Sequence, residues 1–366
     1  LFVLLVKNVP YTFLKLRQRS VFYITATLIN FFLQLAVIIW LVAFRGMGVL
    51  GILAGRLFGE IAGVLIVLPY LVKHIKPELH LRELKEMFRF GFPLVFSGLS
   101  SRVLNMGDRY ILRFLTDLHK VGIYALGYKF ASLIDSLFVN GFRNAFMPFA
   151  WKKQGDRNAD RFYARMLTYF TFFLFWVSLA VAVYARGIVH LFARDTSFWP
   201  AAVIIPVALA AMCAKGMFTI VKMGLQFSRK TAYIASIVVS GALLNIGLNV
   251  MLIPRYNMMG AALATLLSFL FLLSAGYYFS QQKYPLAWEL KRVGIIILTA
   301  VSLYFISETM NGLVLTFRIG LKGILILAFP LLLYGAGFFN KDEKLRIRGS
   351  WKKWKHCRQL CLCWMP

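Results

Sequence analysis

Two stretches decide the fold of this chain: residues 88–111 read FRFGFPLVFSGLSSRVLNMGDRYI, and residues 121–149 read VGIYALGYKFASLIDSLFVNGFRNAFMPF. Each exceeds the roughly 20 residues that a helix needs to cross about 30 Å of hydrocarbon. A charged side chain at the centre of a membrane helix costs about 2.5–3.5 kcal/mol on insertion scales, so such residues usually face a polar cavity or a ligand. The stretches therefore predict a helical membrane protein that handles a charged substrate. Their charged residues include Arg102, Asp108, Arg109, Lys129, Asp135 and Arg143.

The composition extends this prediction to the whole chain. Hydrophobic residues make up 60% of the 366 residues and charged residues only 15%, and the mean hydropathy is +0.71. We predict an all-α, polytopic membrane helical bundle. It has about ten complete spans, at 21–44, 47–72, 88–111, 121–149, 166–185, 200–221, 231–253, 258–279, 293–310 and 319–339.

The net charge of +28 reflects how the loops are arranged rather than a nucleic-acid partner. Lys and Arg alternate along the chain, with 28 in one set of loops and ends and 8 in the other. Positively charged loops stay on the cytoplasmic side. Both ends of the chain are therefore predicted to be cytoplasmic, and no nucleic acid is expected.

Charges deep inside the spans are mostly positive, which favours an anionic substrate. We select Arg102, Lys129, Arg143 and Lys215 as residues that bind its headgroup, because guanidinium and ammonium groups suit phosphate. The alternative is that these charges only pair with one another: Asp108 with Arg102 or Arg109, Asp135 with Lys129, and Arg56 with Glu60.

Polar residues in the two charged stretches recur at helical spacing. One stripe runs from Lys129 to Arg143 at spacings of 3, 4, 4 and 3, and a second runs from Ser97 to Asp108. Such spacing places each stripe on one helical face. The predicted cavity wall therefore also includes Asn105, Ser136 and Asn140.

Catalytic and nucleotide-binding motifs are weak in this sequence. The loops are too short for a soluble catalytic domain, and the histidines are scattered, so we expect neither an enzyme nor a metal centre. Residues 46–51 read GMGVLG, but a dinucleotide fingerprint needs a preceding strand, whereas this one lies between two hydrophobic helices. Cys357, Cys361 and Cys363 form a weak metal motif in a basic tail that suits an interface with anionic lipid.

An internal repeat at an offset of about 210 residues predicts two lobes. Residues 19–24 (RSVFYI) resemble 229–234 (RKTAYI), and residues 51–57 (GILAGRL) resemble 260–266 (GAALATL). Both copies run in the same direction, as expected for lobes related by an axis along the membrane normal.

Motifs along most of the chain resemble the polysaccharide flippases of the multidrug, oligosaccharidyl-lipid and polysaccharide exporter superfamily. The motifs are FGFP at 90–93, DRYIL at 108–112, VGIY at 121–124, Pro148, KT at 230–231, NIGLN at 245–249, LIP at 252–254 and GAA at 260–262.

The resemblance implies a two-lobe transporter that lacks its first four helices. Residues 1–87 would be the remnant of an N-terminal lobe, 88–280 a complete six-span lobe, 290–340 two additional spans, and 341–366 a basic cytoplasmic tail. It also implies flipping of a polyprenyl-pyrophosphate-linked oligosaccharide in the bacterial cytoplasmic membrane. Implied partners are membrane lipids and the polymerase and chain-length machinery, with no cofactor beyond coupling to a proton or sodium gradient. A multidrug or cation antiporter of the same superfamily is the alternative.

Overall fold

The computed structural model describes residues 11, 14, 20–74, 81–156, 159–228, 230–312, 315–336 and 338. Within these ranges every regular secondary-structure element is a helix. The chain divides into two compact units, Leu1–Lys85 and Glu86–Pro366. The basic tail and its three cysteines lie outside the described residues.

The first unit contains a pair of helices that pack closely. Helix α2 (Ser20–Ile39) continues into the π-helical turn η1 (Trp40–Phe44), and α3 (Gly48–His74) follows. Gly46 and Gly48 have φ values of 64° and 52°, which residues other than glycine rarely adopt. At Gly55 a Cβ atom would lie 2.5 Å from Ile38 Cγ1. The glycines of the 46–51 motif thus turn the chain between two helices, which is not the setting of a dinucleotide site.

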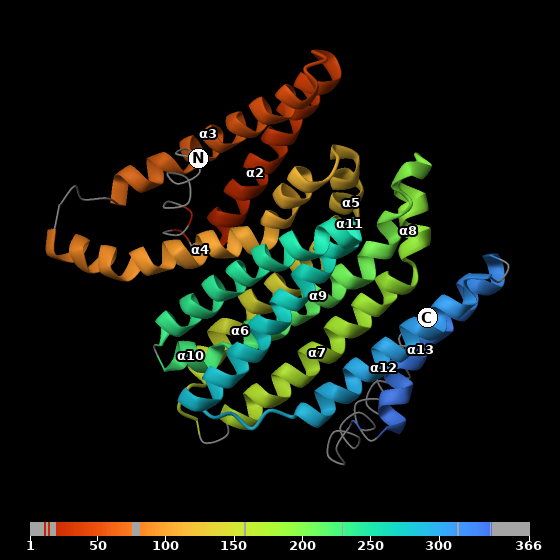
Figure 1. Cartoon of the computed structure of the whole chain (residues 1–366). Helices are drawn as coiled ribbons and strands as arrows, with labels where there is room; N and C mark the ends of the chain where they lie inside the picture. The colour runs from red at the N-terminus through yellow and green to blue at the C-terminus, as the bar shows by residue number, and fades with distance from the viewer. Residues whose placement is uncertain are drawn as a thin grey trace, which may run out of the picture. The chain divides into compact units, whose positions relative to one another are not determined.

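The second unit is a bundle built from long helices (Figure 1). Its core draws on buried aliphatic and aromatic residues from α4 through α12, including the fully buried Tyr124 and Leu174. In chain order, the helical elements from α4 to α11 are α4 (Leu81–Leu115), α5 (Leu118–Ile134), η2 (Asp135–Val139), α6 (Asn140–Lys152), α7 (Ala159–Val183), α8 (Ala185–Phe192), η3 (Thr196–Phe198), α9 (Ala201–Val221), α10 (Met223–Phe227) and α11 (Thr231–Lys283).

Helix α11 folds back on itself. Asn257 has non-helical angles (φ 50°, ψ −128°) and divides the 53 residues into two arms. The arms pack side by side: Asn245 Nδ2 donates a 3.2 Å hydrogen bond to Ser268 Oγ, and Gly241 lies directly against Leu272. This reversal confirms the break that separates residues 231–253 from 258–279 in the sequence prediction.

The last two helices, α12 (Leu290–Thr309) and α13 (Leu315–Gly335), pack against α7 (Figure 1). Trp176 Nε1 of α7 donates a 2.9 Å hydrogen bond to the carbonyl oxygen of Ile326. At the C-terminal end of α7, Lys322 Nζ donates to the carbonyl oxygen of Val183 at 2.9 Å. These contacts hold α12 and α13 against α7 within the second unit.

Seven stretches of the described chain are long and apolar enough to cross a membrane. They are Val21–Phe44, Gly48–Tyr70, Ala159–Val183, Thr196–Phe227, Thr231–Lys283, Leu290–Thr309 and Phe317–Gly335. The protein is therefore a multi-pass membrane protein. The folded-back α11 counts here as one stretch, and the charged helix α4 and the continuous run from α5 to α6 are not among the seven. A total of ten spans stays a prediction.

The loop charges predict on which side of the membrane each exposed loop position lies, and the loop before α5 offers one such position. Asp117 Oδ1 accepts a 2.8 Å hydrogen bond from the backbone N–H of Lys120, which caps α5 and lowers the pKa of Asp117. The neighbouring Leu118 is exposed and does not act as the cap, so a cysteine is better placed there.

In a background with the four native cysteines replaced, Leu118→Cys should react with a membrane-impermeant maleimide added to intact cells, because its loop is poor in Lys and Arg. Lys153→Cys, exposed in a basic loop, should react only after the cells are lysed. The opposite pattern would invert the predicted topology.

Candidate functional site

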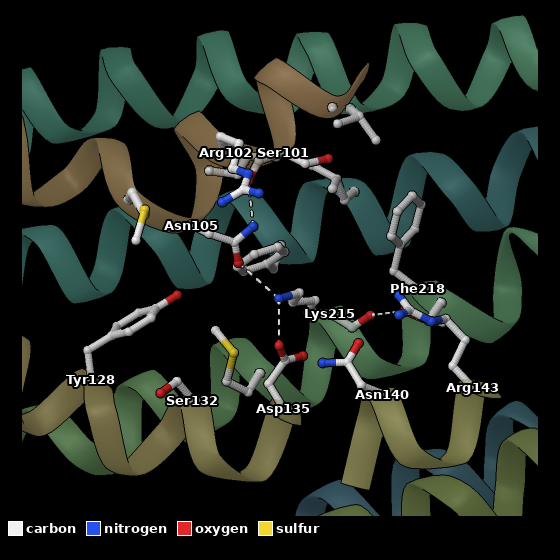
Figure 2. Close-up of a pocket in the computed structure, with 18 of the residues that line it drawn as sticks. Ser101, Arg102, Asn105, Tyr128, Ser132, Asp135, Asn140, Arg143, Lys215 and Phe218 are labelled. Carbon is white, nitrogen blue, oxygen red and sulfur yellow. Dashed lines mark hydrogen bonds and ion pairs between the residues drawn. The ribbon is translucent and has the colours of Figure 1, made fainter. Parts of the chain in front are cut away.

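A cavity of ≈ 880 Å³ lies among the helices of the second unit. Helices α4, α5, α6 and α9 and the turn η2 supply its polar residues, together with Lys222 directly after α9, and α11 adds an apolar wall (Figure 2). Its volume falls within the range of about 300–1,000 Å³ that is common for ligand pockets. The polar lining residues are Ser101, Arg102, Asn105, Arg109, Tyr128, Lys129, Ser132, Asp135, Asn140, Arg143, Lys215, Thr219 and Lys222.

Positive charge dominates this lining. Among the described lining residues six are basic and one, Asp135, is acidic, so the formal charge is +5. Charges surrounded by protein and lipid interact more strongly than charges in water, because the effective dielectric constant is lower. The cavity is therefore suited to an anion.

Lys215 occupies a central position in the cavity. Its Nζ atom lies 2.9 Å from Asp135 Oδ2 and 2.9 Å from Asn105 Oδ1 (Figure 2). This α9 side chain thereby contacts both α4 and η2. The predicted pairing of Asp135 with Lys129 is wrong, because the carboxylate pairs with a lysine 80 positions away in the sequence.

A π-helical turn changes the predicted polar stripe. The backbone N–H of Asn140 bonds to the carbonyl oxygen of Asp135, five residues earlier, across η2. The wider turn lets Asn140 line the cavity together with Asp135, whereas Ser136 is exposed and lies outside the lining. Ser136 therefore departs from the expected face, while Lys129, Asn140 and Arg143 line the cavity.

The four residues selected as headgroup ligands all line this cavity. Arg102 comes from α4, Lys129 from α5, Arg143 from α6 and Lys215 from α9. The first three side chains are exposed, whereas Lys215 is half-buried. Their role in binding remains a prediction.

Asp108 holds helices together beside the cavity and is not part of its lining. The side chain is fully buried and accepts hydrogen bonds from the Tyr124 hydroxyl and from the backbone N–H of Arg109 at 2.8 Å. Thr265 Oγ1 of α11 lies 3.5 Å away. Within the described residues Asp108 makes no side-chain ion pair within 4.0 Å, so a close pair with Arg102 or Arg109 is not formed, and Arg109 contacts the carboxylate through its backbone N–H and a longer-range charge interaction.

The guanidinium of Arg109 lies over the aromatic ring of Tyr128. It lies 4.8 Å from the ring centroid of Tyr128, and Nη1 donates to the carbonyl oxygen of Asn105 at 3.1 Å. A cation over an aromatic face is attracted by the negative face of the ring. Both residues line the cavity.

Arg56 and Glu60 belong to the first unit. Both lie on α3, where Arg56 is exposed and Glu60 is half-buried. They are not part of the cavity described above, and their role as cavity residues stays a prediction.

Lys222 is a cavity residue that the sequence assigned to a loop. Its ammonium lies 5.3 Å from the ring centroid of Phe218, and it lines the cavity with Lys215 and Thr219. The spacing of 4 and then 3 residues from Lys215 to Lys222 places the three on one helical face. Extending the helical stripe past the predicted span end at residue 221 would have identified it.

Comparisons with known proteins bear on the family and on the fold. A family model described as "Polysaccharide biosynthesis protein" matches residues 3–204, and a search of curated protein sequences gives no match. The solved structure of "Lipid II flippase MurJ, inward closed conformation" is similar, with a TM-score of 0.73 and 15% sequence identity over 92% of this chain and 72% of that chain.

At this identity the structural likeness shows the fold, and it confirms the predicted all-helical membrane architecture. The family match confirms the resemblance inferred from the sequence motifs. Because the matched residues 3–204 make up more than half of the 366 residues, the chain belongs to the polysaccharide biosynthesis protein family.

Proposed function

We propose that this chain flips a polyprenyl-pyrophosphate-linked oligosaccharide from the cytoplasmic to the outer leaflet during surface polysaccharide synthesis. The observation that carries the proposal is the cavity lining, in which six basic residues and one acidic residue come from helices of a membrane protein. Membership of a polysaccharide biosynthesis family and a fold shared with a lipid II flippase support it.

The lining offers donors for each polar part of such a substrate. Arg102 and Arg143 supply planar guanidinium groups that can bind phosphate oxygens in pairs, and Lys129 supplies a compact charge. Ser132 and Asn140 supply a hydroxyl and an amide that suit sugar hydroxyls. The polyprenyl chain would remain in the surrounding hydrocarbon, where it is soluble.

The charge of the lining argues against the multidrug or cation antiporter. A cationic substrate needs a carboxylate that is available to it. The single carboxylate among the described lining residues, Asp135, already pairs with Lys215. A cation entering the cavity would meet a formal charge of +5.

Binding of short analogues to the purified full chain tests the proposal. Farnesyl pyrophosphate should bind, and its affinity should fall as salt is raised, because the contacts are ionic. Farnesol, which lacks the pyrophosphate, and the cation tetraphenylphosphonium should bind at least about tenfold more weakly, since one ionic hydrogen bond contributes about 1.5–3 kcal/mol. Preferential binding of tetraphenylphosphonium would favour the antiporter instead.

The proposed flippase function also implies a membrane location, an orientation and downstream partners for the protein. A flippase for this substrate acts in the bacterial cytoplasmic membrane, with both chain ends in the cytosol as the loop charges predict. Its product would be consumed by a polymerase and by chain-length machinery on the outer face.

A further inference from the structure

Asp135 is a carboxylate placed inside a site that otherwise favours anions. One oxygen, Oδ2, lies 2.9 Å from Lys215 Nζ. The other, Oδ1, is buried and accepts no hydrogen bond from the described residues. A buried carboxylate oxygen without a donor is costly. Among the described residues Asp135 therefore depends on Lys215 for its ionic contact, and an anion in the cavity would compete for the same ammonium.

Lys215 is the group over which Asp135 and an anion would compete. An ammonium has three N–H donors, and Asp135 and Asn105 already take up two of them. A phosphate oxygen that approaches Lys215 therefore has two options. It can share the ammonium with Asp135, in which case two negative groups lie close together, or it can displace Asp135 from Lys215. The same contacts link α4, η2 and α9, so displacement would also loosen three helices around the cavity.

A π-helical turn begins at this carboxylate and determines which later residues share its face. With regular helical spacing, Ser136 would lie between Ser132 and Asn140 on the cavity face. In the structure Asp135, three residues after Ser132, keeps the regular bond to Ala131, and the turn η2 that follows brings Asn140 into the same lining. Single π-helical turns occur frequently at functional sites. Here the turn allows Asp135 and Asn140, five residues apart, to line the same cavity, and the negative charge lies beside Lys215.

We propose that Asp135 is a release residue, meaning an internal counter-ion that competes with the substrate's pyrophosphate for Lys215. The inference rests on the proposed flippase function and assigns this residue a part in it. When the headgroup binds, Lys215 turns from Asp135 to a phosphate oxygen. When the headgroup leaves, Asp135 pairs with Lys215 again. Asp135 thus keeps the affinity of the cavity low enough for the substrate to depart.

The test compares farnesyl pyrophosphate binding and flipping by full-chain variants. Asp135→Asn keeps the side-chain shape and an oxygen that can accept from Lys215, so the variant should fold. We expect its Kd for farnesyl pyrophosphate to fall about tenfold, within the usual range of coupling between linked sites, and its flipping rate to fall because release slows. Asp156→Asn, which removes the same charge from an exposed loop position, should change Kd less than about twofold.

A reciprocal variant and a double-mutant cycle make the test specific. Asn105→Asp places a second carboxylate on Lys215 and should raise Kd about tenfold. In a Lys215→Met background, Asp135→Asn should change Kd by no more than about twofold, because the contested ammonium is gone.

Two results would overturn the inference while leaving the anion site intact. These are an unchanged Kd in Asp135→Asn, or an equally large effect of that substitution in the Lys215→Met background. If neither the wild-type chain nor any variant binds farnesyl pyrophosphate, the proposed function and this inference both fail.

Discussion

Replacing both Arg102 and Lys129 with glutamine is expected to abolish flipping. The two side chains reach the cavity from different helices, α4 and α5, so both would contact one headgroup. A hydrogen bond to a charged group contributes about 1.5–3 kcal/mol, so each single substitution should lower transport about 10- to 100-fold. Restoration of surface polymer in a strain that lacks its own flippase measures the effect, with protein levels checked by immunoblotting.

The matched control for this experiment is Arg113→Gln. Arg113 is an exposed arginine on the same helix as Arg102, and it lies outside the described lining. It should support polymer synthesis at the wild-type level. The cavity variants should also retain their thermal stability, because removing a cation from a membrane site relieves a desolvation cost. Normal polymer from the double variant would mean that the headgroup binds elsewhere.

Gly260→Ala is expected to destabilise the second unit strongly. A Cβ at this position would lie 2.4 Å from the carbonyl oxygen of Leu252 and 2.9 Å from the backbone nitrogen of Ile253. The obstructing atoms are backbone, so the sharp reversal of α11 at Asn257 would have to open. Overpacking of this kind costs about 1–3 kcal/mol, and rigid surroundings place the cost at the upper end.

Thermal unfolding in detergent measures this cost, and Gly247→Ala is the matched control on the same helix. No atom lies within 4 Å of the Cβ position at Gly247. Alanine should therefore be neutral there or stabilise the helix by about 0.5–1 kcal/mol. Equal melting temperatures for the two variants would contradict the close packing at the α11 reversal.

The sequence predicted those features that depend on local spacing and on the cost of membrane charges. A charge inside an apolar stretch indicates a functional residue whatever the long-range fold, and this feature identifies Arg102, Lys129 and Arg143. Lys215 was found for the same reason. All four line one cavity.

The features that the sequence did not predict depend on long-range contacts or on a backbone irregularity. The Lys215–Asp135 pair joins residues 80 positions apart, and helical spacing alone favoured Lys129 as the partner. Regular helical spacing predicts Ser136 in the lining, and no local sequence pattern indicates the π-helical turn after which Asn140 shares the lining with Asp135 instead.

The charges that form the candidate site also affect how the spans are recognised. Helix α4 and the run from α5 to α6 carry most of the basic residues of the lining. Those charges keep both helices out of the set that is apolar enough to cross a membrane by composition alone. Buried pairings such as Asp108 with Tyr124 show how the fold accommodates polar groups in these helices.

Leaflet exchange in proteoliposomes tests the central claim most directly. The purified full chain is reconstituted with a fluorescent polyprenyl-pyrophosphate-linked sugar, and the label on the outer leaflet is quenched over time. Our account predicts that the wild-type chain exchanges the lipid between leaflets and that the Arg102→Gln, Lys129→Gln double variant does not. Exchange no faster than in protein-free vesicles, or equal exchange by the double variant, would contradict it.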